Sequence, residues 1–209
     1  MILLINPNAT EAMTADMTRV AQDQAGAIRV EGWTSLDGPP AIQGVEDGEA
    51  AVPPLLKLIE KAAPLKPRAI LIGCFDDTGL AEAQALAPCP VFGIGQAAYH
   101  LAAMIGGRFS VVTTLDVSVP ILRDNVLAYG LGGALAKVRA SGVPVLALEQ
   151  AEARVADEIR LAIAEDGVTS VVLGCGGMAA LRDRLQAETP VRLIDGVRAA
   201  VAMACGLPA

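Results

Sequence analysis

The sequence predicts an α/β fold in which two pseudo-symmetric lobes with parallel sheets face each other across a cleft. Short apolar runs alternate along the 209 residues with longer segments of helical periodicity, a pattern typical of parallel strands joined by crossover helices. Two of the runs, residues 69–72 and 170–173, each lead into a Gly-Cys pair, at Cys74 and Cys175. A Pro-Val-x-x-Ile motif at residues 90–94 recurs at residues 190–194. Both repeats lie about half a chain apart, which indicates duplication.

Three patterns assign the elements of the first half. Unbroken apolar runs predict buried strands, alternation of apolar and polar residues predicts a half-buried strand, and the Ala- and Leu-rich segments between them predict helices. In chain order they give a strand at 1–5, a turn at 6–10, a helix at 11–24, strands at 28–33 and 69–72, a helix at 80–86 and a strand at 91–94.

One long segment interrupts this order. Residues 34–48 have Gly or Pro at positions 38, 39, 40 and 44 and predict a loop of the kind that lies over the working end of a sheet. A helix over 49–62 follows. Pro53 and Pro54 fit that helix only in its first turn, where no N–H is needed.

The second half repeats the same order and sets the predicted lobes. It gives strands at 108–113, 143–148, 169–173 and 191–194, and helices at 117–129, 150–165, 178–187 and from 196 to 204. We place the lobe boundary within residues 95–107. The first lobe then covers residues 1–96, completed by a C-terminal helix within 196–209, and the second covers residues 97–195.

Composition excludes several classes of function. A hydrophobic fraction of 53% is ample for a core, and a net charge of −7 argues against a nucleic-acid partner. Charges, Gly and Pro interrupt every apolar run before it reaches membrane-spanning length. The first residues form a strand rather than a basic leader. We therefore expect a cytoplasmic protein with no membrane segment, in which the four cysteines are free thiols.

The two Gly-Cys pairs are the candidate catalytic residues. A single cysteine at a strand end is more often a packing residue, but two in equivalent places favour a function. Each follows the carboxyl end of a strand, where open α/β folds bind ligands. The amides of the next helix lower a thiol pKa and can stabilise an oxyanion, and Gly176 and Gly177 allow close backbone approach. Thiols from two lobes suit a reaction that needs an acid and a base on opposite faces of one carbon.

The remaining cysteines, the histidine and two acidic residues give weaker evidence of a chemical role. Cys89, between prolines, and Cys205, at the end of the last helix, are interpreted as packing residues. No Cys-x-x-Cys pair exists and His100 is the only histidine, so no zinc site or histidine-based hydrolase is expected. No nucleotide-binding fingerprint is present, and no cofactor is predicted. Asp76 and Asp77 either cap a helix or orient a substrate N–H.

The two cysteine motifs, together with Asn6-Pro7-Asn8-Ala9-Thr10, resemble those of the aspartate/glutamate/hydantoin racemase superfamily, with the hydantoin and allantoin racemase branch most similar. The resemblance spans nearly the whole chain. Further matching segments are residues 38–44, 112–115, 173–178 and 194–197. It implies two flavodoxin-like lobes with the active site between them. It also implies a racemase that needs neither metal nor organic cofactor and acts on a small molecule. We also expect a homo-oligomer.

The resemblance also implies roles for individual residues. Cys74 and Cys175 would exchange the α-proton of a hydantoin-type or related α-carbonyl substrate on its two faces. Ile42 would cover the substrate ring, and the amides after each cysteine would stabilise the enolate. The expected substrate-binding residues are Asn6, Ile42, Phe75, Asp77, Thr78, Thr113, Thr114, Gly176 and Gly177.

Two departures leave the substrate open. The branch commonly has Cys-Phe-Gly-Asp-Pro-Gly-Leu where this chain has Cys-Phe-Asp-Asp-Thr-Gly-Leu at residues 74–80, and Gln43 stands where an acidic residue is usual. The alternative is a decarboxylase or isomerase of the same superfamily, similar to arylmalonate decarboxylase or to an amino-acid racemase. A two-lobed binding protein is a further alternative, but binding alone has no need of paired thiols.

Overall fold

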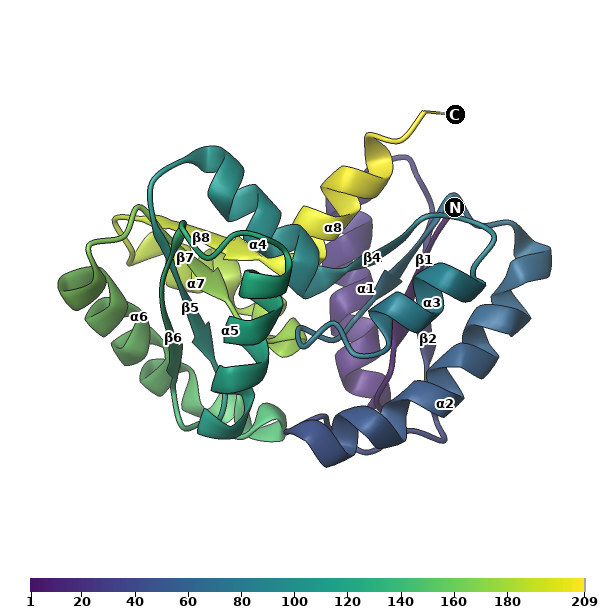
Figure 1. Ribbon diagram of the computed structural model, residues 1–209, viewed down its shortest axis with the longest axis horizontal. Coiled ribbons are helices and arrows are strands. Elements are labelled where there is room, and N and C mark those ends of the chain that lie inside the picture. Colours follow the sequence, from purple (N-terminus) through teal and green to yellow (C-terminus); the bar gives the residue numbers. More distant parts are fainter. Residues whose placement is uncertain (209) are drawn as a thin grey trace.

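The molecule contains two four-stranded parallel sheets, one from each half of the chain, which lie in opposite halves of the structure (Figure 1). This computed structural model describes residues 1–208. The strand order is β2-β1-β3-β4 in the first sheet and β6-β5-β7-β8 in the second, so the second sheet repeats the order of the first. Every pairing is parallel. The structure confirms the predicted α/β class and the equivalence of the two sheets.

The first sheet and its helices come from the N-terminal half. Their bounds are β1 Ile2–Asn6, α1 Glu11–Ala25, β2 Val30–Thr34, α2 Val45–Ala62, the 3₁₀ turn η1 Ala63–Leu65, β3 Ala69–Ile72, α3 Leu80–Leu86 and β4 Val91–Gly93. Strands β1 and β3 are completely buried, as expected for central strands covered on both faces.

The second sheet follows helix α4, which crosses the predicted lobe boundary. The bounds are α4 Ile94–Ile105, β5 Phe109–Thr113, η2 Asp116–Ser118, α5 Val119–Ala128, β6 Leu135–Ala140, η3 Val145–Ala147, η4 Glu149–Ala151, α6 Glu152–Asp166, β7 Ser170–Leu173, η5 Gly176–Ala180, α7 Arg182–Ala187, β8 Arg192–Asp195 and α8 Gly196–Cys205. The predicted helices at 117–129 and 178–187 therefore begin as the 3₁₀ turns η2 and η5.

The predicted strand at 143–148 is wrong. It contains Pro144, which has no N–H for a sheet ladder, and the segment forms the turn η3 instead. The edge strand that pairs with β5 is β6, in which Lys137 and Arg139 interrupt the apolar pattern that marks a buried strand. Arg139 is buried all the same, because three carboxylates of α6 pair with it.

Helix α2 also differs from the prediction. It begins at Val45 rather than at residue 49, so Pro53 and Pro54 lie in its interior and not in its first turn. Two prolines there leave the carbonyls of Glu49 and Ala50 without helical partners. Both of those residues are exposed, so water can satisfy the carbonyls. The side chain of Asp47 accepts a hydrogen bond from the N–H of Gln43 (3.0 Å), which supports the earlier start.

Helices α4 and α8 lie between the two sheets and pack against each other (Figure 1). One hydrophobic cluster includes residues of both helices and of strands from both sheets, among them Leu4, Leu71, Val111 and Val172. Helix α8 also packs on α1. Of the predicted segment 196–209, residue 209 lies outside the described residues.

Arg68, just before β3, fixes the end of α8. Its guanidinium donates hydrogen bonds to the carbonyls of Ala204 (3.1 Å), Cys205 (3.2 Å) and Leu207. A cation at a helix C-terminus also interacts favourably with the helix dipole. The last helix is thereby attached to the first lobe, although its strand, β8, belongs to the second sheet.

Candidate active site

Cys74 and Cys175 lie in the wall of the same cavity, between the carboxyl ends of the two sheets. We call it the cysteine cavity. Its volume is about 30 Å³, room for about two water molecules. The first lobe contributes Asn8, Met13, Ile42, Gly73, Cys74, Phe75 and Asp76, and the second contributes Thr113, Thr114, Ser118, Val145, Gly174, Cys175 and Gly176. The two predicted catalytic residues thus face one shared space.

The backbones that carry the cysteines approach each other closely. A Cβ added to Gly176 would lie 2.8 Å from the Met17 sulfur and 3.2 Å from the carbonyl oxygen of Gly73. A larger residue at this position would have to displace the Met17 side chain and move the two turns apart. Gly176, next to Cys175, therefore lets the turn of one lobe touch the turn of the other, and this contact brings the two thiols into one cavity.

The Cys74 thiol is the harder of the two to ionise. Its sulfur lies 3.4 Å from the Thr78 hydroxyl, and the N–H of Asp76 also points to it. Burial raises the pKa of Cys74 far above its ordinary value, and the nearby carboxylate of Asp76 raises it further. The two hydrogen bonds lower it only in part. At neutral pH Cys74 is a thiol, the form that donates a proton.

Cys175 is the more easily ionised thiol. It precedes η5, and the N–H groups of Gly177 and Met178 hydrogen-bond to its sulfur. Burial still dominates and raises the pKa of Cys175 to about 11, with the charge of Asp76 adding to the effect. Because the amides stabilise a thiolate here, Cys175 is the cysteine that more readily takes the thiolate form and so acts as the base.

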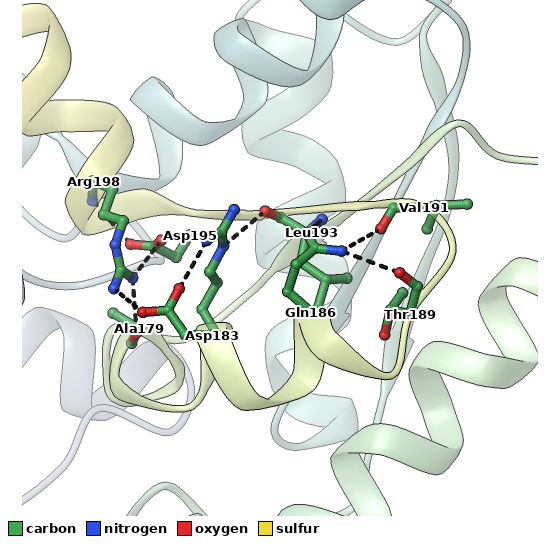
Figure 2. A network of polar contacts seen from close by, with 9 residues as sticks. Ala179, Asp183, Gln186, Thr189, Val191, Leu193, Asp195 and Arg198 are labelled. Carbon is green, nitrogen blue, oxygen red and sulfur yellow. Dashed lines mark hydrogen bonds and ion pairs between the residues drawn. The ribbon is translucent and has the colours of Figure 1, made fainter.

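A polar network (Figure 2) holds η5, the turn that follows Cys175 in the chain. The Arg198 guanidinium donates to the Ala179 carbonyl (3.0 Å) and to Asp195 (3.0 Å) and Asp183 (2.9 Å). Asp195 also caps α8 by accepting from the Arg198 N–H at 2.9 Å. The Ile-Asp-Gly-Val segment at 194–197 thus positions the cysteine turn from outside the cavity.

Asp76 lies in the cavity wall with an unsatisfied oxygen. Its Oδ2 is buried and has no hydrogen-bond partner among the described residues. Burial raises the pKa of the Asp76 carboxyl to about 7. Its charge contributes to the raised pKa of both cysteines. Asp76 is therefore electrostatically coupled to the proton-transfer pair.

Asp77 lies beside the cavity, not in its wall. Its carboxylate accepts hydrogen bonds from the N–H of Gly95 (3.0 Å), at the start of α4, and from the Tyr129 hydroxyl (2.9 Å). Burial raises the pKa of Asp77 to about 7, against these hydrogen bonds. The residue has a positive φ of 53°. The sequence left two interpretations of Asp77, a helix cap or a group that orients a substrate N–H. Its contacts are those of a cap, and the capped helix is α4.

Asn6 supports the site through a neighbour. It is completely buried, and its amide donates to the side chains of Asn8 (2.9 Å) and Thr14 (3.0 Å). Asn8, two residues later, is the side chain that lines the cavity. The Asn-Pro-Asn turn was identified from the sequence, but the choice between its two asparagines needed the structure.

Thr113 and Thr114 line the cavity, and Thr113 donates to the carbonyl of Gly174 at 2.9 Å. Phe75 and Gly176 also lie in the wall, whereas Thr78 and Gly177 line neighbouring pockets. The sequence interpretation missed Met13, Ser118 and Val145. Val145 falls in the segment wrongly predicted as a strand, so no pattern marked it.

Two loops cover the cavity from opposite lobes. Ile42, on the first, is buried in the wall, as is Val145 on the second. They are joined by the Gln43 side chain, which accepts a hydrogen bond from the Val145 N–H at 3.0 Å. Gln43, one of the departures from the branch pattern, therefore holds the cover closed across the cleft.

The remaining candidates lie outside the cavity wall. Cys89 packs against the core of the first sheet and Cys205 against the shared core. The His100 ring contacts the Gln96 carbonyl at 2.7 Å. Within residues 1–208, no cluster of three His, Cys, Asp or Glu side chains could hold a metal ion. In the same described range, no helix is both long and apolar enough to cross a membrane.

Known proteins with this fold were found by sequence and by structure. The family model for Asp/Glu/Hydantoin racemase matches residues 2–204. A hydantoin racemase from Rhizobium meliloti is 47% identical, over 97% of this chain and 86% of that protein. The structure of an allantoin racemase from Klebsiella pneumoniae superposes with a TM-score of 0.94 at 39% identity, covering 97% of this chain and 85% of that one. A variant of arylmalonate decarboxylase shares the fold alone, with a TM-score of 0.68 at 16% identity over 100% of this chain and 94% of the other.

Proposed function

Because the chain belongs to the Asp/Glu/hydantoin racemase family, we propose that it racemises a hydantoin-type substrate by passing the α-proton between Cys74 and Cys175 without a cofactor. Racemase activity itself follows from the family and from the 47% identity to a hydantoin racemase. The observation that carries the mechanism is the shared cavity, into which each lobe contributes one thiol.

The reaction needs no partner outside the protein. The Cys175 thiolate removes the α-proton, so the C–H bond breaks, an S–H bond forms, and the electron pair moves onto the adjacent carbonyl as an enolate. The Cys74 thiol then gives its proton to the opposite face of the same carbon. The protonation states of the two sulfurs are now exchanged, and the enzyme is ready for the reverse direction.

Polar groups of the cavity can stabilise the enolate. Thr114 lies in the wall beside Thr113, whose hydroxyl is donated to the Gly174 carbonyl. The N–H groups that follow each cysteine point to the sulfurs and become available when a thiolate takes up a proton, and fixed donors of this kind stabilise a developing oxyanion. The cavity holds about 30 Å³, less than a five-membered ring needs, so the loops at Ile42 and Val145 must open to admit substrate.

The test is to replace the cysteines one at a time. Cys74→Ser and Cys175→Ser should each reduce racemisation by at least about 10³-fold, because each removes one of the two general acid–base groups. Cys89→Ser is the matched control and should keep full activity. Measured in D₂O, each single variant should still exchange the α-proton of the one enantiomer that faces the remaining thiol. Full racemisation by either single variant would exclude the scheme.

The same experiment separates racemisation from decarboxylation. A racemase incorporates solvent deuterium into substrate with no net product, whereas a decarboxylase releases CO₂. We also propose a cytoplasmic location, which the four free thiols support. We propose in addition that the protein is a homo-oligomer. Light scattering coupled to gel filtration tests the oligomeric state, and a monomeric mass would contradict it.

A further inference from the structure

A second pocket adjoins the cysteine cavity and shares Asp76 with it. We call it the outer pocket. Its volume is about 250 Å³, against about 30 Å³ for the cysteine cavity. Val45, Gly48 and Glu49 of α2 form one side, and Ile121 of α5 lies in the wall contributed by the second lobe. A substituent on the reacting carbon can therefore extend past Asp76 into space that the cysteine cavity does not provide.

Asp76, the residue that the two pockets share, carries a charge that no described neighbour compensates. Its Oδ2 is buried and unpaired among the described residues, whereas the adjacent Asp77 has both oxygens hydrogen-bonded. Leaving a buried carboxylate without a donor is costly. None of the described residues that line the two pockets is Lys or Arg, and Glu49 adds a second carboxylate to the outer one.

The position of Asp76 also connects it to the reaction. Its negative charge disfavours the thiolate form of both cysteines. A cation placed against Asp76 would offset that charge and favour the thiolate. A substrate that carries such a cation would thus help to form the base that attacks it, while a neutral substrate would not.

We propose that Asp76 is a specificity-determining residue that binds an ammonium or guanidinium group on the C5 substituent of the substrate, with the substituent lying in the outer pocket. This inference rests on the proposed function, since it names the substrate class of the same site. It concerns a residue at which this chain departs from the Gly of the branch pattern.

The test compares two 5-substituted hydantoins of the same length, one ending in a guanidinium and one in a neutral urea. Wild type should bind the guanidinium compound at least tenfold more tightly in calorimetry and racemise it with at least tenfold higher kcat/KM. Asp76→Asn, nearly the same in shape, should remove most of that preference and leave binding of the urea compound little changed. Because it removes the charge that disfavours the thiolates, it should raise kcat/KM for the urea compound. Glu46→Gln, an exposed acid of α2 outside both pockets, is the control and should match wild type.

The possible outcomes separate this inference from the proposed function. Equal binding of both compounds by wild type, or an unchanged preference in Asp76→Asn, would overturn the role of Asp76 even if both compounds are racemised. Preferential binding of the guanidinium compound without racemisation of either would support the cation site and reject the proposed function. Unchanged binding of the urea compound to Asp76→Asn shows that the variant is folded, so a lost preference can be assigned to the missing charge.

Discussion

Cys74 and Cys175 occupy equivalent places in the two lobes but not equivalent environments. Cys175 receives two backbone N–H groups, whereas Cys74 has one N–H, a hydroxyl at 3.4 Å and a carboxylate nearby. The Gly-Cys pairs and their strand-end positions could be predicted from the sequence alone. This asymmetry could not, because it depends on where the Asp76 side chain points.

The raised thiol pKa values predict the pH dependence of the reaction. With the pKa of Cys175 at about 11, the thiolate fraction of free enzyme grows close to tenfold per pH unit through the neutral range. The kcat/KM for racemisation should therefore keep rising from pH 7 to about pH 9. Thiolate absorbance in a variant that combines Cys74→Ser, Cys89→Ser and Cys205→Ser, in which Cys175 is the only cysteine left, checks the titration independently. A plateau in kcat/KM below pH 8 would contradict the assignment.

Two tyrosines near Asp77, Tyr129 half-buried and Tyr99 completely buried, predict opposite effects on stability. The Tyr129 hydroxyl donates to Asp77 at 2.9 Å, while the Tyr99 hydroxyl is buried without a partner among the described residues. Tyr129→Phe should lower the free energy of unfolding by about 1–2 kcal/mol because it leaves a buried carboxylate short of a donor. Tyr99→Phe should leave it unchanged or raise it by up to about 1 kcal/mol. Urea denaturation of both variants measures the difference, and equal losses would reject this interpretation.

At the scale of single elements, charge explains which strand was missed. The central strands β1, β3, β5 and β7 are entirely apolar or nearly so and could be predicted from the sequence. The edge strand β6 carries Lys137 and Arg139, and its fit in the sheet depends on acids of α6 that lie about 20–30 residues away in the chain. An ion pair between residues so far apart in the chain cannot be predicted from the local sequence pattern.

The buried ion pairs of Arg139 predict a large and pH-dependent effect on stability. Its guanidinium binds both oxygens of Asp166 (2.7 and 2.6 Å) and also Glu158 and Glu165, and Ser110 donates to Asp166 as well. Arg139→Met should cost about 3–5 kcal/mol at pH 7, because it leaves Asp166 buried and unpaired. Arg160→Met, which breaks an exposed pair on the same helix, should cost less than about 1 kcal/mol.

The sign of the pH dependence follows from Asp166. Hydrogen bonds from Arg139 lower the pKa of this carboxyl, so its contribution to stability is present above the unfolded-state pKa of about 4 and is lost as the pH falls through the folded-state value. Without Arg139 the buried carboxyl takes up a proton more readily. The gap between wild type and Arg139→Met should therefore shrink as the pH is lowered from about 5 to about 3 in urea denaturation. A gap that is independent of pH would show that packing, not charge, is lost.

At the scale of the whole molecule, the two lobes share one core. Helices α4 and α8 start on glycine-containing turns and meet between the sheets, where a Cβ on Gly196 would lie 2.3 Å from the carbonyl oxygen of Ile94. The internal repeat predicted the two sheets, and the strand ends predicted the place of the site. The shared core was not predicted, because two lobes built from one pattern could equally be joined by a flexible linker.

This shared core predicts that the lobes unfold together. Trp33, the only tryptophan, lies in β2 and reports on the first lobe, whereas Ile159 is buried in a cluster of the second lobe. Ile159→Ala should lower the free energy of unfolding by about 2–5 kcal/mol. The urea midpoint seen by Trp33 fluorescence should shift as far as the midpoint seen by far-UV circular dichroism. Leu161→Ala, at an exposed position of the same helix, should move neither midpoint by much. If Ile159→Ala shifted the circular dichroism but left the Trp33 transition in place, the lobes would be independent units, and the contact that brings the two cysteines into one cavity would not be maintained by a common core.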